Sequence, residues 1–502
     1  MTDACVLTIR AHTQNRLSQM SLKGNIILNY INTLTSIIFP VITFPYAARV
    51  LSPEGIGSVD FLNSIINYII IFTNLGIPFY AIREIAKYRD DIRLRNKKTF
   101  EILCLCIMMA VLGYIAVYII GISSPRINRN IDIFYILSFA IFFNAIGAQW
   151  FYQAIEDFKF ITIRAIIVRV AFTIWLFMFV KDERDTLFYA VFLVGSTVSN
   201  YLINFIHLRK FLIPTRIHIS ELSIKPHIKP TLKVFIMFVF VSVYVHLNTI
   251  LLGFLQDDKS VGYYTAGMKI SRIINTLITS VGAVLLPRCS NLVQADDKES
   301  FRRVASKSYH LMMACALPVS IALVCLARPI TMTLCGDAFE GSVAVVAITG
   351  PTAIFVSLSN IIGMQILFPM NKENIVITAT AIASVINVAI NLMFVPLFAE
   401  KGAALAIALA ELSIAVAEYA IGRKYIPFKL IDRNIRQYFT GSCVMLIAIL
   451  AISVLLKNNL AVLLAGSVAG FIVYAGYLCA KREEIAMEIL SRCLSIIKIQ
   501  KR

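Results

Sequence analysis

Two cations three residues apart, Lys269 and Arg272, lie near the centre of the apolar stretch 261–290. A cation at mid-membrane costs roughly 2.5 to 3.5 kcal/mol on insertion scales, so it normally faces a wet cavity or a bound anion. Residues three apart share one face of a helix. The spacing therefore predicts a cationic site for a negatively charged group, although pairing with a buried Glu or snorkelling to the membrane surface would also accommodate these side chains.

Two further cations, Arg164 and Arg169, lie within the apolar stretch 160–180. Five residues separate them, so they point about 140° apart on a helix and at most one faces a cavity squarely. Arg169 lies nearer the middle of the stretch and is the stronger candidate. Arg164 either lines the cavity or snorkels to lipid headgroups.

Three titratable groups inside apolar stretches, His246, Glu411 and Glu418, are candidates for coupling or gating. A neutral His or a protonated Glu moves between states at lower cost than its charged form. His246 also fits a packed core, and Glu411 also fits an ion pair with one of the paired cations. Asp60, at the start of another stretch, is a gating candidate through pairing with Arg49.

The composition predicts an all-α, polytopic membrane protein. Over 502 residues the chain is 58% hydrophobic and 15% charged, with a mean hydropathy of +0.77. Soluble domains carry about 25% charged residues. The net charge of +18 is explained by topogenic loops and an anionic inner leaflet, and the basic loops lack the signatures of nucleic-acid-binding folds, so no nucleic-acid partner is expected.

Apolar stretches of about 20 residues, enough to cross the hydrocarbon core, number fourteen. They lie near residues 25–48, 58–79, 99–122, 131–154, 160–180, 186–206, 232–253, 262–286, 307–327, 340–368, 375–395, 402–421, 436–456 and 459–479. Of the 47 Lys and Arg residues, 34 fall in the two tails and the even-numbered connections, and nine in the odd-numbered connections. The positive-inside rule therefore predicts that both termini are cytoplasmic.

An internal repeat organises the first twelve stretches. Residues 146–180 align without a gap with residues 362–396, and the acidic turn LSPEGIGSVDF (51–61) resembles LQDDKSVGYYT (255–265). The repeat unit is six helices, an even number, so its two copies share one orientation and are related by a pseudo-two-fold along the membrane normal. The sequence thus predicts two six-helix lobes with two additional C-terminal helices.

This repeat divides the chain into six predicted regions. They are a cytoplasmic extension (1–23), an N-lobe (24–206), a basic cytoplasmic linker (207–231), a C-lobe (232–421), the two last helices (422–480) and a basic cytoplasmic tail (481–502). Bundles of this kind place their substrate where the repeats meet and work by rocking one lobe against the other.

Several motifs resemble the polysaccharide (oligosaccharide) flippases of the multidrug/oligosaccharidyl-lipid/polysaccharide exporter superfamily. These are FPVITFPYAARVLSPEGIGSVDF (39–61), QWFYQAIEDFKFITIR (149–164), and VGYYTAGMKI with LLPRCSNL (261–270 and 285–292). The resemblance implies a fourteen-helix carrier in the bacterial cytoplasmic membrane. Such a carrier moves undecaprenyl-diphosphate-linked oligosaccharide to the outer leaflet by alternating access, for O-antigen, capsule or exopolysaccharide synthesis.

The resemblance also implies which residues meet the diphosphate. The family lines its cavity with Arg and Lys, and the matching positions are Lys269, Arg272 and Arg49, the last within PYAARVL. Implied partners are the lipid-linked oligosaccharide and membrane lipids, with a polysaccharide polymerase and export machinery downstream.

Other classes fit the sequence less well. No HExxH, GxSxG or P-loop pattern occurs, so the chain is predicted to be a transporter without enzymatic activity, cofactor or metal. The adjacent pairs Asp90-Asp91, Asp257-Asp258 and Asp296-Asp297 fit solvated loop charges. A cation-coupled multidrug exporter and a peptidoglycan-precursor flippase of the same superfamily remain alternatives.

Overall fold

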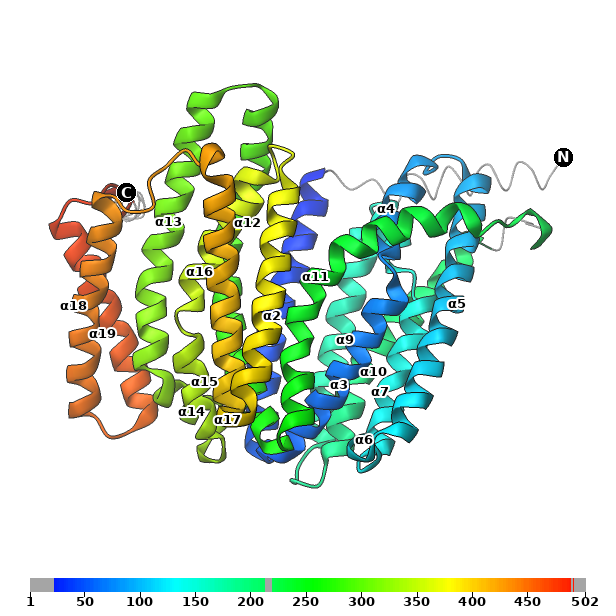
Figure 1. Cartoon of the computed structure of the whole chain (residues 1–502), viewed down its shortest axis with the longest axis horizontal. Coiled ribbons are helices and arrows are strands. Elements are labelled where there is room, and N and C mark those ends of the chain that lie inside the picture. The colour runs from blue at the N-terminus through cyan, green and yellow to red at the C-terminus, as the bar shows by residue number, and fades with distance from the viewer. Residues whose placement is uncertain (1–21, 213–218, 489–490, 492–502) are drawn as a thin grey trace, which may run out of the picture. The chain divides into compact units, whose positions relative to one another are not determined.

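The computed structural model describes residues 22–212, 219–488 and 491, and every regular element in these ranges is a helix (Figure 1). The predicted all-α class is therefore confirmed. Large apolar side chains are exposed along the helices, as at Leu397 and Val454. Such a surface suits contact with hydrocarbon rather than water. The predicted extension (1–23) and tail (481–502) lie largely outside the described residues.

The chain divides into two compact units, Met1–Leu51 with Phe61–Ser242 and Ser52–Asp60 with Val243–Arg502. The first unit contains α2 (Leu22–Val50), most of α3 (Pro53–Asn74), α4 (Ile77–Lys87), α5 (Ile92–Ser123), α6 (Pro125–Asn128), α7 (Ile131–Ile146), α8 (Gln149–Ala154), α9 (Phe158–Phe179), α10 (Thr186–Leu212), the short η1 (Ile219–Glu221) and the larger part of α11 (Lys225–Leu255).

The second unit contains the remaining helices and the first turns of α3. These helices are α12 (Asp258–Gln294), α13 (Lys298–Cys325), α14 (Ala327–Cys335), η2 (Asp337–Phe339), α15 (Gly341–Thr349), α16 (Thr352–Ser359), the π-helix η3 (Asn360–Leu367), α17 (Glu373–Gly422), η4 (Arg423–Tyr425), α18 (Arg433–Leu455) and α19 (Asn459–Ala480). Helices α18 and α19 pack on each other, and α18 also packs on α13.

The number of membrane spans stays a prediction. Among the described residues, eleven helical stretches are long and apolar enough to cross a bilayer, or twelve if the bent pair Asp258–Ser280 and Leu285–Gln294 is one span. Helix α17 contains two predicted spans, 375–395 and 402–421, divided by non-helical backbone at Ala399. The predicted span 232–253 falls in α11, where most side chains from 233 to 245 lie outside the description.

Aspartates in the short connections begin several helices. The side chain of Asp91 accepts a hydrogen bond from the backbone N–H of Leu94, Asp257 does so from Ser260, and Asp297 from Ser300. Such caps satisfy backbone donors that the first helical turn leaves free. The bond from Ser300 also lowers the pKa of Asp297 below its ordinary value. One Asp of each adjacent pair is therefore a helix cap as well as a loop charge.

The two acidic turns paired in the sequence repeat pack directly on each other. A Cβ added to Gly57 would lie 1.7 Å from the carbonyl oxygen of Asp258, and one added to Gly262 would lie 2.0 Å from the carbonyl oxygen of Pro53. Pro53 precedes Gly57 by the same interval as Asp258 precedes Gly262. The contact is thus reciprocal, and only glycine permits the backbones of α3 and α12 to approach this closely.

The aligned segments 146–180 and 362–396 also break the α-helix at equivalent places. In the first, α7 ends before Ala148, which has a left-handed backbone, and in the second the π-helix η3 occupies this position. Each segment then turns at a left-handed residue, Glu156 or Asn371, and these two residues are one position apart in the alignment. These shared irregularities support the internal repeat, since chance similarity between apolar helices would not reproduce them.

Polar contacts fasten the connection between α10 and α11 to α5. Glu101, buried in α5, accepts hydrogen bonds from Lys98 at 2.8 Å and from the backbone of Ser223 at 3.0 Å, and contacts His227 Nε2 at 2.8 Å. Asn96 donates to the carbonyl oxygen of Phe211 at 2.7 Å. Both ends of the connection are therefore held by one helix of the first unit.

Candidate functional site

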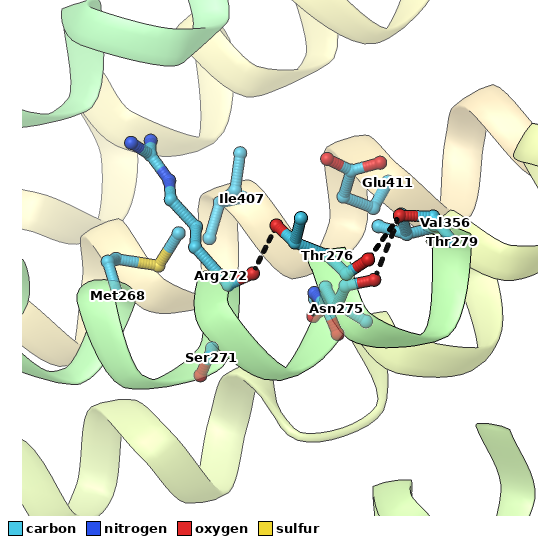
Figure 2. A pocket seen from close by; sticks show the side chains of 10 residues that line it. Met268, Ser271, Arg272, Asn275, Thr276, Thr279, Val356, Ile407 and Glu411 are labelled. Carbon is cyan, nitrogen blue, oxygen red and sulfur yellow. Dashed lines mark hydrogen bonds between the residues drawn. The ribbon is translucent and has the colours of Figure 1, made fainter. Parts of the chain in front are cut away.

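A polar pocket of about 360 Å³ lies in the second unit, and Arg272 lines it. Its walls come from α12, α16 and α17 (Figure 2). The lining residues are Met268, Ser271, Arg272, Asn275, Thr276, Thr279, Thr352, Val356, Ile407 and Glu411. Within this lining Arg272 is the single cation and Glu411 the single acid, so the pocket brings together two of the predicted site residues.

Helical spacing explains how α12 presents its polar side chains to the pocket. Arg272, Asn275 and Thr279 recur at intervals of three and four residues, which is one face of a helix. Asn275 donates to the Thr352 hydroxyl at 3.1 Å, which joins α12 to α16. Ser271 and Thr349 share a hydrogen bond of 2.7 Å, which joins α12 to α15. These bonds fix the walls, and Arg272 remains exposed.

Arg272 of α12 and Glu411 of α17 line the pocket from two different helices, and the guanidinium of Arg272 extends away from the Glu411 carboxyl group (Figure 2). Glu411 is half-buried on α17. His246 of α11 and Tyr264 of α12 lie close enough to Arg272 to interact electrostatically with its guanidinium. His246 is half-buried, and its interaction with Arg272 places it near the predicted site as well.

Lys269 does not line this pocket but forms an ion pair with Asp60. Its Nζ lies 2.7 Å from Oδ2 of Asp60, and the side chains are 33% and 9% exposed, respectively. The sequence hypothesis paired Asp60 with Arg49, and it did not foresee this bridge between α3 and α12. The repeat held a signal, because Asp60 lies in one of the two acidic turns that it pairs and Lys269 follows the other turn by four residues.

The remaining candidate cations lie in the first unit. Arg164 is buried, contacts the side-chain oxygen of Asn204 and lies over the Phe160 ring, so it does not snorkel outward. Arg169 is half-buried, and its guanidinium donates to the Thr35 hydroxyl at 2.6 Å and to the Asn32 side chain at 3.0 Å.

Both arginines therefore fasten α9, Arg164 to α10 and Arg169 to α2. Arg49 lies in the last turn of α2 and is exposed.

Glu418 is buried two helical turns beyond Glu411 on α17. A Cβ added to Gly363 would lie 2.8 Å from its Oε1, so the π-helix η3 packs against the carboxyl group. The Ser359 hydroxyl is nearby, but within the described residues neither carboxyl oxygen has a hydrogen bond of normal geometry. A charged carboxylate would be costly in such a place, which favours the neutral acid.

An apolar groove of about 470 Å³ runs between α13, α18 and α19 of the second unit. Side chains such as Leu311, Pro318, Met445, Ile449 and Phe471 line it. Its chemistry matches a hydrocarbon chain rather than a polar ligand. Within the described residues no group of three or more His, Cys, Asp or Glu side chains is placed to hold a metal ion.

Comparison with known proteins decides the family. Residues 22–293, more than half of the chain, match the family described as polysaccharide biosynthesis protein. The chain belongs to this family. Residues 234–393 also match the MatE family. The resemblance inferred from the motifs is thereby confirmed.

Relatives of this polysaccharide biosynthesis protein include two described as putative O-antigen transporters. One, from Escherichia coli (strain K12), is 24% identical over 396 residues, which is 78% of this chain and 95% of the relative. The other, from Shigella dysenteriae, is 25% identical over 356 residues, which is 70% of this chain and 88% of the relative.

A solved structure shares the fold. It is lipid II flippase MurJ in an inward closed conformation, with a TM-score of 0.72 and 17% identity, covering 91% of this chain and all of that one. The chain is therefore a multi-pass membrane protein with the fold of a membrane transporter.

Proposed function

We propose that this protein is a flippase that moves oligosaccharide repeat units linked to undecaprenyl diphosphate from the cytoplasmic to the outer leaflet by alternating access. The observation that carries the proposal is the polar pocket that Arg272 lines together with Asn275, Thr276 and Thr279. A diphosphate cannot cross hydrocarbon without a positively charged partner. Removing its charges from water would cost far more free energy than a transport cycle supplies. A cation in a polar pocket removes that barrier.

The cargo has three chemical parts, and features of the second unit are complementary to them. Arg272 offers a guanidinium that binds phosphate oxygens in a bidentate manner. The hydroxyl and amide groups beside it are partners for sugar hydroxyls. The apolar groove beside α18 and α19 suits a polyprenyl tail. The description of two relatives as putative O-antigen transporters agrees with this cargo.

The ion pair between Lys269 and Asp60 is the proposed gate. An anion that binds Lys269 competes with the Asp60 carboxylate, so cargo weakens the bridge between α3 and α12. Binding energy is thereby spent on releasing a contact that holds one conformation, which is how a ligand shifts a conformational equilibrium. Arg49, Arg169 and Arg164 are proposed to contribute positive charge from the first unit.

Translocation by the purified protein in proteoliposomes tests the proposal. Arg272→Ala and Lys269→Ala are each expected to lower the transfer of a lipid-diphosphate oligosaccharide to the opposite leaflet by at least about tenfold, the effect of losing one charge-assisted contact. Arg328→Ala is the matched control, because this exposed arginine pairs with Glu340 away from the pocket. Full transfer by the Lys269→Ala/Arg272→Ala double variant would contradict the assigned roles.

The proteoliposome assay and a growth test separate the related carriers. A multidrug exporter would transport an organic cation in preference to the lipid diphosphate, and a peptidoglycan-precursor flippase would restore growth to cells lacking their own. We expect neither result. We place the protein in a bacterial cytoplasmic membrane with both termini cytoplasmic, which labelling of cysteines introduced in the terminal segments will test.

A further inference from the structure

The Arg272 pocket contains a charge that opposes its proposed ligand. Glu411 is the single acid of the lining, and it shares the cavity with the single cation. If Glu411 is ionised, a bound anion meets a net charge near zero. If Glu411 is neutral, its negative charge no longer offsets the positive charge of Arg272 in the pocket.

We propose that Glu411 is a proton-binding site coupled to anion binding at Arg272: it takes up one proton when an anion enters the pocket and releases it when the anion leaves. This inference rests on the proposed function. No covalent step is involved, since the proton moves between solvent and a carboxylate oxygen of Glu411. The protonated acid can also donate a hydrogen bond to the anion, which the ionised form cannot.

The surroundings of Glu411 leave few other groups for this role. Apart from Arg272, the other lining residues of α12, α16 and α17 are Met, Ser, Asn, Thr, Val and Ile, whose side chains do not titrate. Beyond the lining, Tyr264 of α12 and His246 of α11 interact electrostatically with Arg272. Glu418 lies on the same face of α17 as Glu411, two helical turns further along. Glu418 is buried against Gly363, away from the pocket lining, and is expected to keep its proton throughout.

The coupling has a defined sign. A proton on Glu411 favours the anion, so by linkage the anion favours the proton. Anion affinity is therefore highest at low pH and falls as the pH rises through the titration of Glu411. With one proton bound per anion, affinity falls tenfold for each pH unit on the falling limb.

Isothermal titration calorimetry on the purified full-length protein tests the proposal. The probe is P1,P2-dimethyl diphosphate, a diester whose charge does not change near neutral pH. Titrations in buffers of different ionisation enthalpy count the protons taken up, and we expect one per anion in the wild type. Glu411→Gln, which resembles the protonated form, is expected to bind without proton uptake and with an affinity independent of pH.

Two variants serve as controls in this titration. Glu373→Gln changes an acid in the first turn of the same helix, outside the lining, and should keep the wild-type proton count. His246→Gln should keep it as well. Wild-type binding without proton uptake, or uptake that survives Glu411→Gln and disappears in His246→Gln, would overturn the proposal while leaving the anion site intact. Absence of binding at every pH would remove the anion site and the proton site together.

Discussion

Replacing Asp60 by Asn is expected to tighten anion binding at Lys269. The Asp60 carboxylate lies 2.7 Å from Lys269 Nζ, and the substitution removes its charge while keeping an oxygen that can accept the same hydrogen bond. An anion on the other side of the ammonium group would lie roughly 6 Å from the carboxylate. At an effective dielectric constant of about 20, Coulomb's law gives roughly 3 kcal/mol of repulsion at that distance.

This repulsion corresponds to about a hundredfold in affinity. Screening lowers it, because the Lys269 side chain is 33% exposed, so we expect Asp60→Asn to gain between about tenfold and about a hundredfold. The same change weakens the bridge between α3 and α12. Transport should therefore slow even as anion binding tightens. Without the charged Asp60, the ion pair that forms the proposed gate is weaker and competes less well with the anion for Lys269.

Calorimetric binding of the diester diphosphate, paired with the proteoliposome assay, measures both effects. Glu54→Gln is the matched control, since Glu54 and Lys259 form an exposed ion pair between the same two helices at 3.7 Å. Exposed pairs contribute about 0 to 1 kcal/mol, so this variant should resemble the wild type in both assays. Equal or weaker anion binding by Asp60→Asn would refute the competition between Asp60 and the anion.

Three other predictions concern stability and protonation. Gly57→Ala would place a Cβ 1.7 Å from a backbone carbonyl oxygen and is expected to lower the unfolding free energy by about 1 to 3 kcal/mol. Gly476→Ala, with open space around it, should be neutral or stabilising by up to about 1 kcal/mol. Thermal melts of the two variants test this contrast, and equal melting temperatures would contradict it. Glu101→Ala would leave Lys98, the backbone N–H of Ser223 and the buried His227 without the Glu101 carboxylate and is expected to cost about 3 to 5 kcal/mol, against under about 1 kcal/mol for Glu84→Ala at a more exposed pair. A melt of Glu101→Ala no lower than that of the control would count against this network. Glu418→Gln should remove an infrared band of a protonated carboxylic acid at neutral pH and leave the fold intact, whereas an ionised carboxylate in the wild type would show that the neutral assignment is wrong.

The helical class followed from the sequence because hydrocarbon forces every backbone group to bond within its own segment. The apolar stretches therefore located the helices. Their separation into spans is harder to predict, because α17 continues through 373–422 with one irregular residue, Ala399, and that break depends on local backbone geometry rather than on hydropathy. The π-helix at 360–367 has no signal in composition either.

The side-chain partners in the site were less predictable than the helices. Spacing alone placed Arg272 on a helix face, and Glu411 and Lys269 were each correctly expected inside apolar helices. Which acid meets which cation depends on helix rotation and packing, so Asp60 was assigned to Arg49 although it bonds Lys269. Arg164 likewise appeared able to reach the headgroups, and instead it is held by Asn204, 40 residues away.

The adjacent aspartates show a signal that was present but not used. An Asp that immediately precedes an amphipathic or apolar run is typical of a helix cap, and Asp91, Asp257 and Asp297 all have this position. Reading them as caps would have fixed the starts of three helices to the residue.

The reciprocal approach of Gly57 and Gly262 has the pattern of an isologous interface, in which each partner offers the other the same surface. Two identical half-length chains could meet at such a point with no adjustment, since one residue type satisfies both sides. A single polypeptide is not bound to this identity: here Asp60 lies on one copy and Lys269 on the other, an asymmetry that no pair of identical subunits can encode.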